Sequence, residues 1–184
     1  MHALLALFLV GLLFHGYVKS NAPSNQPTFQ ELYEFLNTGR PIWTVLSSAY
    51  LGARNQQLMC LNITKLSLKD DQYNYTYCYR NGSDTHCEEE NALLKNDTKY
   101  PQIVVKGKTD KKGVTYRATY FHTNLWCVIL RFTQNGEENC EMRVRDETVS
   151  KMNGTVTTDC EVAFDECKKN KYKYYDESCK TTNN

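Results

Sequence analysis

Several residues and motifs that an enzyme or a metal site needs are scarce or missing in this sequence of 184 residues. Of its four histidines, only His86 and His122 lie beyond residue 20. The Gly-x-Ser-x-Gly motif of hydrolases is absent, and so is the Cys-x-x-Cys spacing that is common in zinc sites. Because catalysis needs a nucleophile beside a base or paired carboxylates in a cleft, the sequence predicts a protein that is not an enzyme and that uses no metal and no cofactor.

A long hydrophobic run occurs only at the N-terminus, in residues 1–14. A membrane span needs about 20 apolar residues, so this run is too short to be one. Small and polar residues follow it through Ser20, an order that is typical of a secretory signal peptide, although a charged leading region is missing. We expect residues 1–20 to be cleaved and residues 21–184 to form a single domain that is secreted and extracellular.

An excess of charge of one sign is also lacking. The chain has 22 basic and 21 acidic residues, and the loss of Lys19 with the signal peptide leaves 21 of each. A protein that binds nucleic acid or an acidic lipid surface usually carries a basic patch or stripe. We therefore expect no nucleic-acid partner and no membrane partner.

The chain is rich in cysteines and in glycosylation sequons. An even count of cysteines in an exported chain is typical of a disulfide framework. The eight cysteines are Cys60, Cys78, Cys87, Cys127, Cys140, Cys160, Cys167 and Cys179. Five sequons agree with the secretory route. Their asparagines, which we predict to be glycosylated, are Asn62, Asn74, Asn81, Asn96 and Asn153.

Tyrosines alternate strictly with other residues in the stretch 72–80, which predicts a half-buried β-strand. One face of this strand carries Tyr73, Tyr75, Tyr77 and Tyr79. The opposite face carries Asn74, and a hydrated glycan there must point into solvent, so we expect the tyrosine face to point inward. An inward wall of tyrosines is either part of a packed core or the lining of a ligand site, and the pattern leaves both alternatives open.

Two capping boxes predict helices near the two ends of the chain. Thr28 and Glu31 have the required spacing, and Thr158 and Glu161 repeat it. We expect the first helix to end at Gly39 in the left-handed conformation. The second helix carries two cysteines on its apolar face, which predicts that it is crosslinked to another element.

Between the helices, β-branched and aromatic residues recur in short stretches bounded by turn residues. The predicted strands are residues 42–50, 58–68, 72–80, 103–106, 114–121, 126–132 and 140–145, while the acidic stretch 86–91 is ambiguous. This spacing favours an antiparallel sandwich or barrel, and an eight-stranded barrel is wide enough to hold one small molecule. We predict a mainly β fold: an eight-stranded antiparallel lipocalin-type barrel with an N-terminal and a C-terminal helix packed outside.

Strand parity predicts where further side chains point. Cys60 shares a face with the sequon residue Asn62 and is expected to point outward. The residues expected to point inward are Met59, Leu61 and Ile63. Trp43 is expected to plug the closed end of the barrel, under the first helix.

Four segments of the chain together match features of one protein family. A leading helix precedes Trp43-Thr-Val-Leu, a strand bears Cys60 in Leu-Met-Cys-Leu, a later strand reads Asn-Leu-Trp-Cys-Val-Ile-Leu around Cys127, and the C-terminal segment ends in Ser178-Cys179-Lys180. On these features the chain resembles the tick salivary lipocalins of the histamine-binding type, over nearly the whole mature chain.

The resemblance implies two disulfide bonds, Cys60–Cys179 and Cys127–Cys160. Four cysteines then remain, which allow three pairings. We predict the pairs Cys78–Cys87 and Cys140–Cys167. The first pair is close in sequence, and the second adds another link from a strand to the C-terminal helix.

The resemblance also implies an amine site inside the barrel, because a buried ammonium group must be paired with carboxylates and aromatic rings can only assist. Tyr50 falls where the family has a site tyrosine, and Glu141 falls where it has a site glutamate. Ala53 and Ala118 occupy positions where amine binders carry aspartates, and Lys108 falls near another site tyrosine. The match to the amine site is therefore partial.

Arg143 is expected on the same face as Glu141, where it would neutralise the carboxylate. A neutral, aromatic or lipid-like ligand that bears an acid or a hydroxyl group therefore fits the barrel at least as well as an amine does. An exposed Glu141 that pairs with Arg143 or Arg145 on the surface is the alternative to a site residue. The candidate ligand contacts are Tyr50, Tyr73, Tyr75, Tyr77, Tyr116, Trp126, Glu141 and Arg143.

By resemblance, the expected function is to bind and sequester a small host mediator in the barrel and so to suppress host defence. The mediator would be a biogenic amine such as histamine or serotonin, or a lipid, and the protein would act as a monomer. The alternative is an immune or clotting inhibitor that binds a host protein through the outer surface of the barrel.

Overall fold

The computed structural model describes residues 26–53, 56–97, 99–106, 113–150, 158–167 and 169–180, and the structural statements below refer to these residues. The predicted signal peptide, the sequon at Asn153, Lys108 and the side chain of Ala53 lie outside them.

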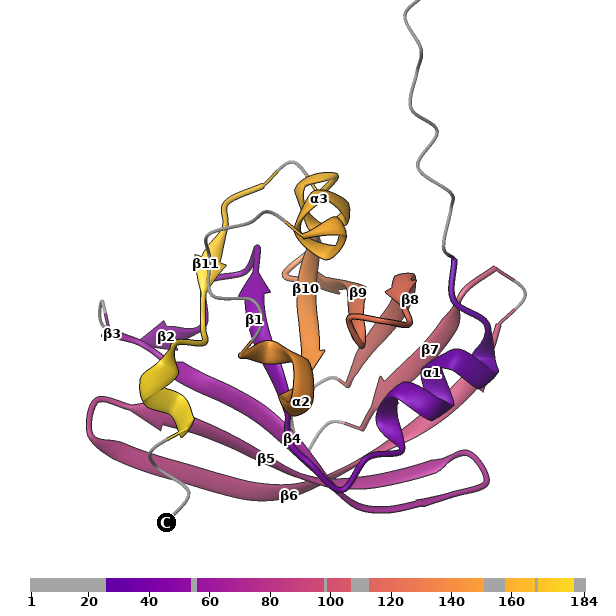
Figure 1. Ribbon diagram of the computed structural model, residues 1–184, viewed down its shortest axis with the longest axis horizontal. Helices are drawn as coiled ribbons and strands as arrows, with labels where there is room; N and C mark the ends of the chain where they lie inside the picture. The colour runs from indigo at the N-terminus through magenta and orange to yellow at the C-terminus, as the bar shows by residue number, and fades with distance from the viewer. Residues whose placement is uncertain are drawn as a thin grey trace, which may run out of the picture.

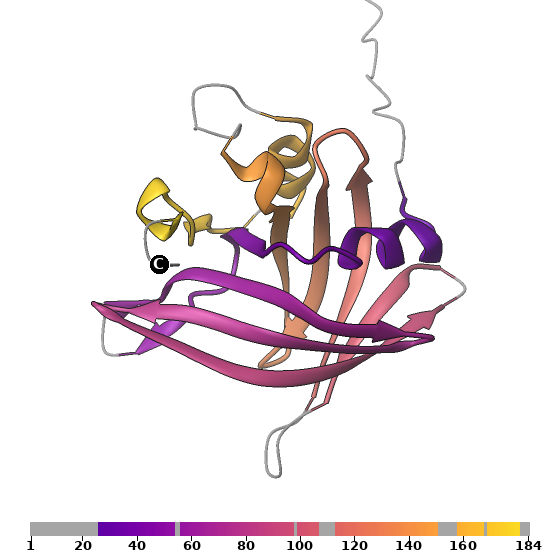
Figure 2. The same ribbon diagram turned by 60° about the horizontal axis from the view of Figure 1, so that its bottom comes forward.

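Eight strands form one closed sheet, and each strand is antiparallel to its neighbours (Figure 1, Figure 2). They are β1 (Ile42–Ser47), β4 (Met59–Lys69), β5 (Gln72–Asn81), β6 (Asp84–Asn96), β7 (Pro101–Val105), β8 (Val114–His122), β9 (Cys127–Gln134) and β10 (Glu137–Arg145). The strands from β4 to β10 pair in sequence order, β1 pairs with β4, and β10 pairs back with β1. The predicted eight-stranded antiparallel barrel is therefore confirmed.

Shorter elements complete the described chain. They are α1 (Phe29–Leu36), the strand pair β2 (Gly52–Ala53) and β3 (Gln56–Gln57), α2 (Asp146–Val149), α3 (Asp159–Asp165), β11 (Tyr172–Lys173) and the 3-10 helix η1 (Glu177–Lys180). In Figure 1, α3 and the C-terminal segment lie on the side of β1 and β10, whereas α1 lies on the side of β7.

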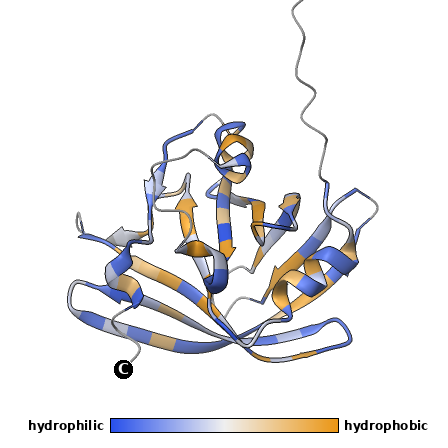
Figure 3. Ribbon diagram, in the orientation of Figure 1, coloured by the Kyte–Doolittle hydropathy of each residue, from blue (hydrophilic) through white to orange (hydrophobic). Residues whose placement is uncertain are grey.

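The ambiguous acidic stretch forms part of β6, which at 13 residues is the longest strand. β6 pairs with β5 without a register shift from Gln72–Leu93 to Asn81–Asp84. Acidic residues have a low strand propensity, but pairing with the tyrosine strand overrides it. Figure 3 shows mainly hydrophilic residues along β6, and its residues 84–89 are exposed. The tight turn before it contains Gly82, whose φ of +64° favours glycine.

Both predicted capping boxes are present. In α1 the Thr28 hydroxyl accepts from the Glu31 amide, and the Glu31 carboxylate accepts from the Thr28 amide; α3 has the same arrangement. The expected left-handed end at Gly39 is wrong, because the helix is capped at Asn37 and Gly39 does not have a positive φ. The side chain of Arg145 donates to two carbonyl groups of the last helical turn, so these groups need no glycine cap.

The barrel wall has an apolar cluster on each side. The inner cluster lies inside the barrel and includes the apolar face of α1; its buried members are Leu32, Phe35, Leu36, Ile42, Ile63, Tyr73, Tyr75, Ala92, Leu94, Ile103, Ala118, Phe121, Val128 and Leu130. The outer cluster lies under α2, α3 and the C-terminal segment; its buried members are Trp43, Val45, Leu46, Cys60, Cys127, Ile129, Cys140, Met142, Val144, Val149, Cys160, Phe164, Tyr175 and Cys179.

The expected place of Trp43 inside the barrel is wrong. Trp43 belongs to the outer cluster, where its ring lies 5.2 Å from that of Tyr175 and its Nε1 donates to Asp146 Oδ1 at 2.9 Å. Every residue of β1 is buried, so alternation in the sequence does not reveal which face points inward. Cys60 lies on the outer side as predicted, but Met59 also packs there, because the pairing of β4 with β5 shifts register after Met59 and Cys60 has a φ of 56°.

Four disulfides tie the C-terminal third of the chain to the barrel and close one hairpin. The pairs are Cys60–Cys179, Cys78–Cys87, Cys127–Cys160 and Cys140–Cys167, the same four that were predicted. In the described part of the chain no cysteine is free.

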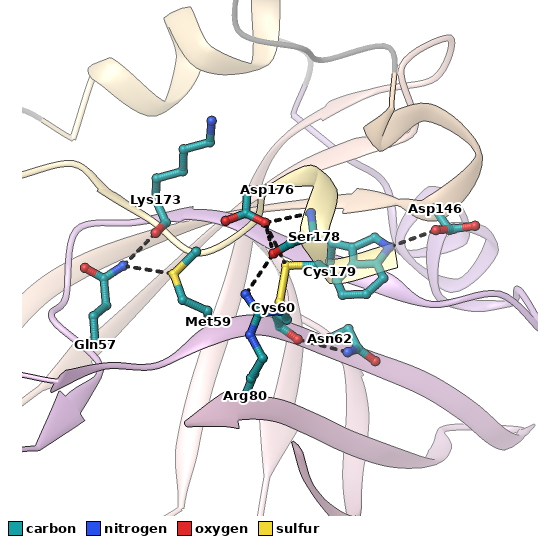
Figure 4. Close-up of a disulfide and its surroundings, with 11 residues drawn as sticks. Gln57, Met59, Cys60, Asn62, Arg80, Asp146, Lys173, Asp176, Ser178 and Cys179 are labelled. Carbon is teal, nitrogen blue, oxygen red and sulfur yellow. Dashed lines mark hydrogen bonds between the residues drawn. A yellow bond between two sulfur atoms is a disulfide. The ribbon is translucent and has the colours of Figure 1, made fainter. Parts of the chain in front are cut away.

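Residues 172–180, which we call the C-terminal strap, complete the wall where β4 separates from β1. The Tyr174 amide donates to the Val45 carbonyl of β1, and the Cys60 amide of β4 donates to the Tyr174 carbonyl. Figure 4 shows the strap held against β4 and β5 by the Cys60–Cys179 disulfide and by the bond from Arg80 to Ser178. The C-terminal strap is thus part of the barrel wall.

Candidate functional site

The tyrosine face of β5 points into the barrel, as predicted. Tyr73 and Tyr75 belong to the inner cluster, and Tyr77 packs against it. On the other face, Asn74 is half-buried, and its side chain donates to Ser67 Oγ at 2.9 Å. The last tyrosine of the row, Tyr79, is half-buried and stacks on the exposed His86.

A buried ion pair lies across the barrel from these tyrosines. Glu141 is only 4% exposed, so the alternative of an exposed surface charge is wrong. Its Oε2 accepts from Arg143 Nε at 2.9 Å and from Nη2 at 2.8 Å. The Arg143 guanidinium lies 4.9 Å from the centre of the Tyr116 ring. Burial is the largest single influence on the pKa of Arg143 and lowers it. The charge and the hydrogen bond of Glu141, together with Tyr116 and Tyr75, outweigh burial, so the pKa of Arg143 is raised.

Four tyrosines surround this ion pair, and each has a pKa raised well above its ordinary value. Burial is the main cause in every case. The charge of Arg143 acts on all four phenols and opposes this rise, while Glu141 adds to it for two of them. The four are Tyr73, Tyr75, Tyr77 and Tyr116.

Glu90 joins the group, although the sequence did not reveal it. Its Oε2 accepts from the Tyr75 hydroxyl at 2.9 Å, and its charge raises the pKa of Tyr75, Tyr77 and Tyr116. Glu90 lies opposite Tyr75 in the ladder, so both side chains lie on the inner face. The register of the β5–β6 hairpin was the signal that could have revealed Glu90, because a residue of β6 that pairs with an inward-facing residue of β5 also faces inward. With Glu90 and Glu141 against Arg143, the group has one net negative formal charge.

Tyr174 is a second group that the sequence did not indicate. The C-terminal strap places it in the wall, fully buried, with its hydroxyl accepting from the Leu51 amide at 2.7 Å and donating to the Ala49 carbonyl at 2.9 Å. Burial, with a smaller contribution from Glu141, raises the pKa of Tyr174 to about 12.

Trp126 lies at the end of the barrel that α1 covers. It precedes β9 in a turn, and its ring packs against Phe121 at 5.9 Å. The Arg145 guanidinium stacks over the same ring at 3.8 Å and reaches the carbonyls of α1. Trp126 therefore helps to close the barrel, apart from the ion pair.

Tyr50 does not join the other predicted site residues. It is 43% exposed, and its ring packs edge-on against Tyr172 at 5.4 Å. It lines a surface pocket beside the turn between β9 and β10, together with Asn139 and Glu137. Ala118, at a position where amine binders carry an aspartate, is completely buried in the inner cluster.

Two features are absent from the ranges that the structure describes, a cluster of metal ligands and a membrane-spanning helix. No group of three or more His, Cys, Asp and Glu side chains there could hold a metal ion. No helix in those ranges is long and apolar enough to cross a membrane.

Comparison with solved structures finds similar barrels. A structure described as AM182 in complex with serotonin is 13% identical, with a TM-score of 0.56, over 80% of this chain and 91% of that one. Japanin from Rhipicephalus appendiculatus, bound to cholesterol, is 16% identical, with a TM-score of 0.54, over 77% of this chain and 96% of that one. At such identities the likeness shows the fold alone.

Comparison at the level of sequence identifies the family. A search of curated proteins finds no significant match. Residues 20–181 match the family model described as tick histamine binding protein, and this range contains all four disulfides and the whole barrel. This chain therefore belongs to the tick histamine-binding protein family.

Proposed function

We propose that this protein binds a small amine, such as histamine or serotonin, inside its barrel and thereby sequesters it. The observation that carries the proposal is the excess of negative charge on the inner face of the barrel, where the buried Glu141 and the half-buried Glu90 accompany the guanidinium of Arg143. An ammonium group leaves water only at a large cost unless a negative charge compensates it. A monovalent organic cation would bring this group of charges to neutrality.

The tyrosines favour the same class of ligand. Their rings can stack on an aromatic ligand and contact an ammonium group through cation–π interaction. Their phenols are neutral at physiological pH, because the ordinary pKa of tyrosine is near 10 and burial raises it further here. They can therefore donate and accept hydrogen bonds without adding charge.

A ligand with a carboxylate fits the charges less well. It would meet two acidic groups, and the guanidinium of Arg143 is already engaged by Glu141. A neutral lipid is not disfavoured in this way. The two similar structures are described with serotonin and with cholesterol, which supports the binding of either kind of small ligand by a barrel of this fold.

We further propose that the protein is secreted, acts as a monomer and suppresses host defence by removing a mediator. Membership of a tick histamine-binding family and four disulfides support secretion. Among the sequons, Asn81 and Asn96 are exposed and are the best placed for a glycan. The Asn62 amide is half-buried and donates to the Cys60 carbonyl.

The test is calorimetric titration of the secreted protein with histamine, serotonin, a fatty acid and cholesterol. We expect an amine to bind and Glu90→Gln to weaken it by about ten- to a hundredfold, since hydrogen bonds to charged groups contribute roughly 1.5–3 kcal/mol. Glu141→Gln should weaken it at least as much, because Arg143 then loses its ion-pair partner and its guanidinium repels the ammonium group.

The matched control is Glu89→Gln, which removes one negative charge from the exposed residue beside Glu90 in the chain. Its side chain points to the other face of β6, so amine affinity should stay within about twofold. Cholesterol affinity should change little in all three variants. The proposal is abandoned if no amine binds, or if Glu90→Gln and Glu89→Gln affect an amine equally.

A further inference from the structure

The hydroxyl group of Tyr73 is buried without a hydrogen-bond partner. Tyr73 is 1% exposed, and its Oη has no hydrogen-bond partner among the described residues. The neighbouring Tyr75, whose ring stacks on that of Tyr73 at 5.0 Å, has its hydroxyl bonded to Glu90. The two phenols are adjacent and nearly parallel, but only the hydroxyl of Tyr75 has a hydrogen-bond partner.

An unpaired buried hydroxyl costs free energy, so natural proteins keep such groups rarely. Phenylalanine would fill the same space at this position and avoid the cost. Tyr73 lies on the inner face, beside the apolar end that α1 closes, and the charge of Arg143 acts on it from β10. The unpaired hydroxyl therefore belongs to the interior of the barrel and not to the outer surface.

We infer that the Tyr73 hydroxyl recognises a hydrogen-bonding group at the end of the ligand opposite its ammonium, so that the barrel prefers a hydroxylated aromatic amine to the same amine without the hydroxyl. This inference rests on the proposed function. The carboxylates of Glu90 and Glu141 hold the ammonium, the aromatic body lies along the tyrosine row, and the ligand hydroxyl pairs with Tyr73.

The spacing along β5 suits such a ligand. Glu90 lies opposite Tyr75, and Tyr73 is two residues further along the strand. Two residues of a strand advance about 7 Å along the backbone, and the rings of Tyr73 and Tyr75 lie 5.0 Å apart. A small aromatic amine is long enough to extend from the carboxylate of Glu90 to the hydroxyl of Tyr73. A site built to hydrogen-bond a hydroxyl rejects the analogue without it, because the protein group is then left unpaired.

The experiment compares serotonin with tryptamine, which lacks only the ring hydroxyl, by calorimetric titration of the full secreted protein. For the natural protein we expect serotonin to bind about tenfold or more tightly than tryptamine. In Tyr73→Phe the two affinities should become equal, through weaker binding of serotonin and unchanged binding of tryptamine. The free Tyr73→Phe protein should be as resistant to urea as the natural one or more so.

The control variant is Tyr79→Phe, at the half-buried end of the same row. It should leave the preference for serotonin unchanged. The inference is overturned, and the proposed function stands, if serotonin and tryptamine bind the natural protein equally, if the preference survives in Tyr73→Phe, or if histamine binds and neither indole amine does. If no amine binds at all, the inference and the proposed function fail together.

Discussion

The side chains inside this barrel combine aromatic rings and neutral hydroxyls with three charged groups, Glu90, Glu141 and Arg143, whose formal charges sum to one negative charge. Tyr77 and Tyr116 present rings to the interior and phenols to the ion pair of Glu141 and Arg143. Such a lining can bind the ring of a ligand by stacking and its polar ends by hydrogen bonds. Because Glu90 adds a second carboxylate to the lining, the interior favours a positively charged ligand.

Alkaline pH should reveal the buried phenols. Burial raises the pKa of Tyr73, Tyr75, Tyr77 and Tyr116 in the folded protein, whereas in the unfolded chain they titrate near their ordinary value of 10. Below pH 10 both states keep these protons, so stability is unaffected. Above it only the unfolded chain loses them, so the free energy of unfolding should fall as pH rises toward the folded-state pKa values.

Urea unfolding between pH 8 and 11.5 measures this fall, and absorbance at 295 nm counts the phenolates. At pH 11 at least four tyrosines should ionise only when the protein unfolds. The same titration in concentrated urea is the control. Ionisation of all the tyrosines of the folded protein with a midpoint near 10 contradicts the prediction.

Among the elements, the C-terminal strap has the most unexpected role. Its backbone joins β1 to β4, and Tyr174 enters the wall from it. Two strands that separate leave unpaired amide and carbonyl groups, and an added segment satisfies them. The Cys60–Cys179 disulfide holds this segment although the two cysteines lie 119 residues apart in sequence.

The two disulfides at the ends of β4 and β5 should differ in their contribution to stability. Loop-closure entropy predicts a loss of about 5 kcal/mol for the variant with Cys60→Ser and Cys179→Ser, against about 2.6 kcal/mol for Cys78→Ser with Cys87→Ser. The second pair is the matched control, since it closes a loop of sequence separation 9. Urea unfolding of the two double variants measures the difference.

The variant with Cys60→Ser and Cys179→Ser should also bind an amine more weakly, because it no longer holds the strap in place by a disulfide. The strap carries Tyr174, which is part of the wall near Glu141. The control variant should bind as the natural protein does. Equal losses of stability in the two double variants would show that the strap is not an integral part of the barrel.

As a whole, the molecule is a barrel covered at one end by α1 and along one side by α2, α3 and the strap (Figure 2). An enclosed ligand contacts many strands at once, so its binding should stabilise the entire fold. A ligand at a concentration of 100 times its Kd adds about 2.7 kcal/mol to the free energy of unfolding.

For a domain of this size we expect an amine at that concentration to raise Tm by about 5–10 °C. Differential scanning calorimetry with increasing amine measures the shift. Glu90→Gln at the same amine concentration should show a clearly smaller shift, and an equal shift would place the bound amine elsewhere on the molecule.

Local patterns in the sequence were sufficient for much of the fold. The capping boxes at Thr28 and Thr158, the strand over the tyrosines and the number of strands depend on residues that are neighbours in the chain. The pattern was insufficient for Trp43, because β1 is buried on both faces, and for Gly39, because Arg145 caps α1 from a distant strand. Contacts between residues far apart in the chain produce no periodic pattern in the sequence.

For the candidate site, too, local patterns in the sequence predicted some features and contacts between distant segments set the others. By itself, the sequence determined that Tyr73, Tyr75 and Tyr77 share one face and that Glu141 shares a face with Arg143, since parity along a strand is a local property. Only the tertiary structure decided that these faces meet inside a closed barrel, that Glu90 adds a second carboxylate there, and that Tyr50 lies outside the group. Strand register and barrel closure arise from contacts between distant segments, so the net charge of the interior appears only when the sheet closes.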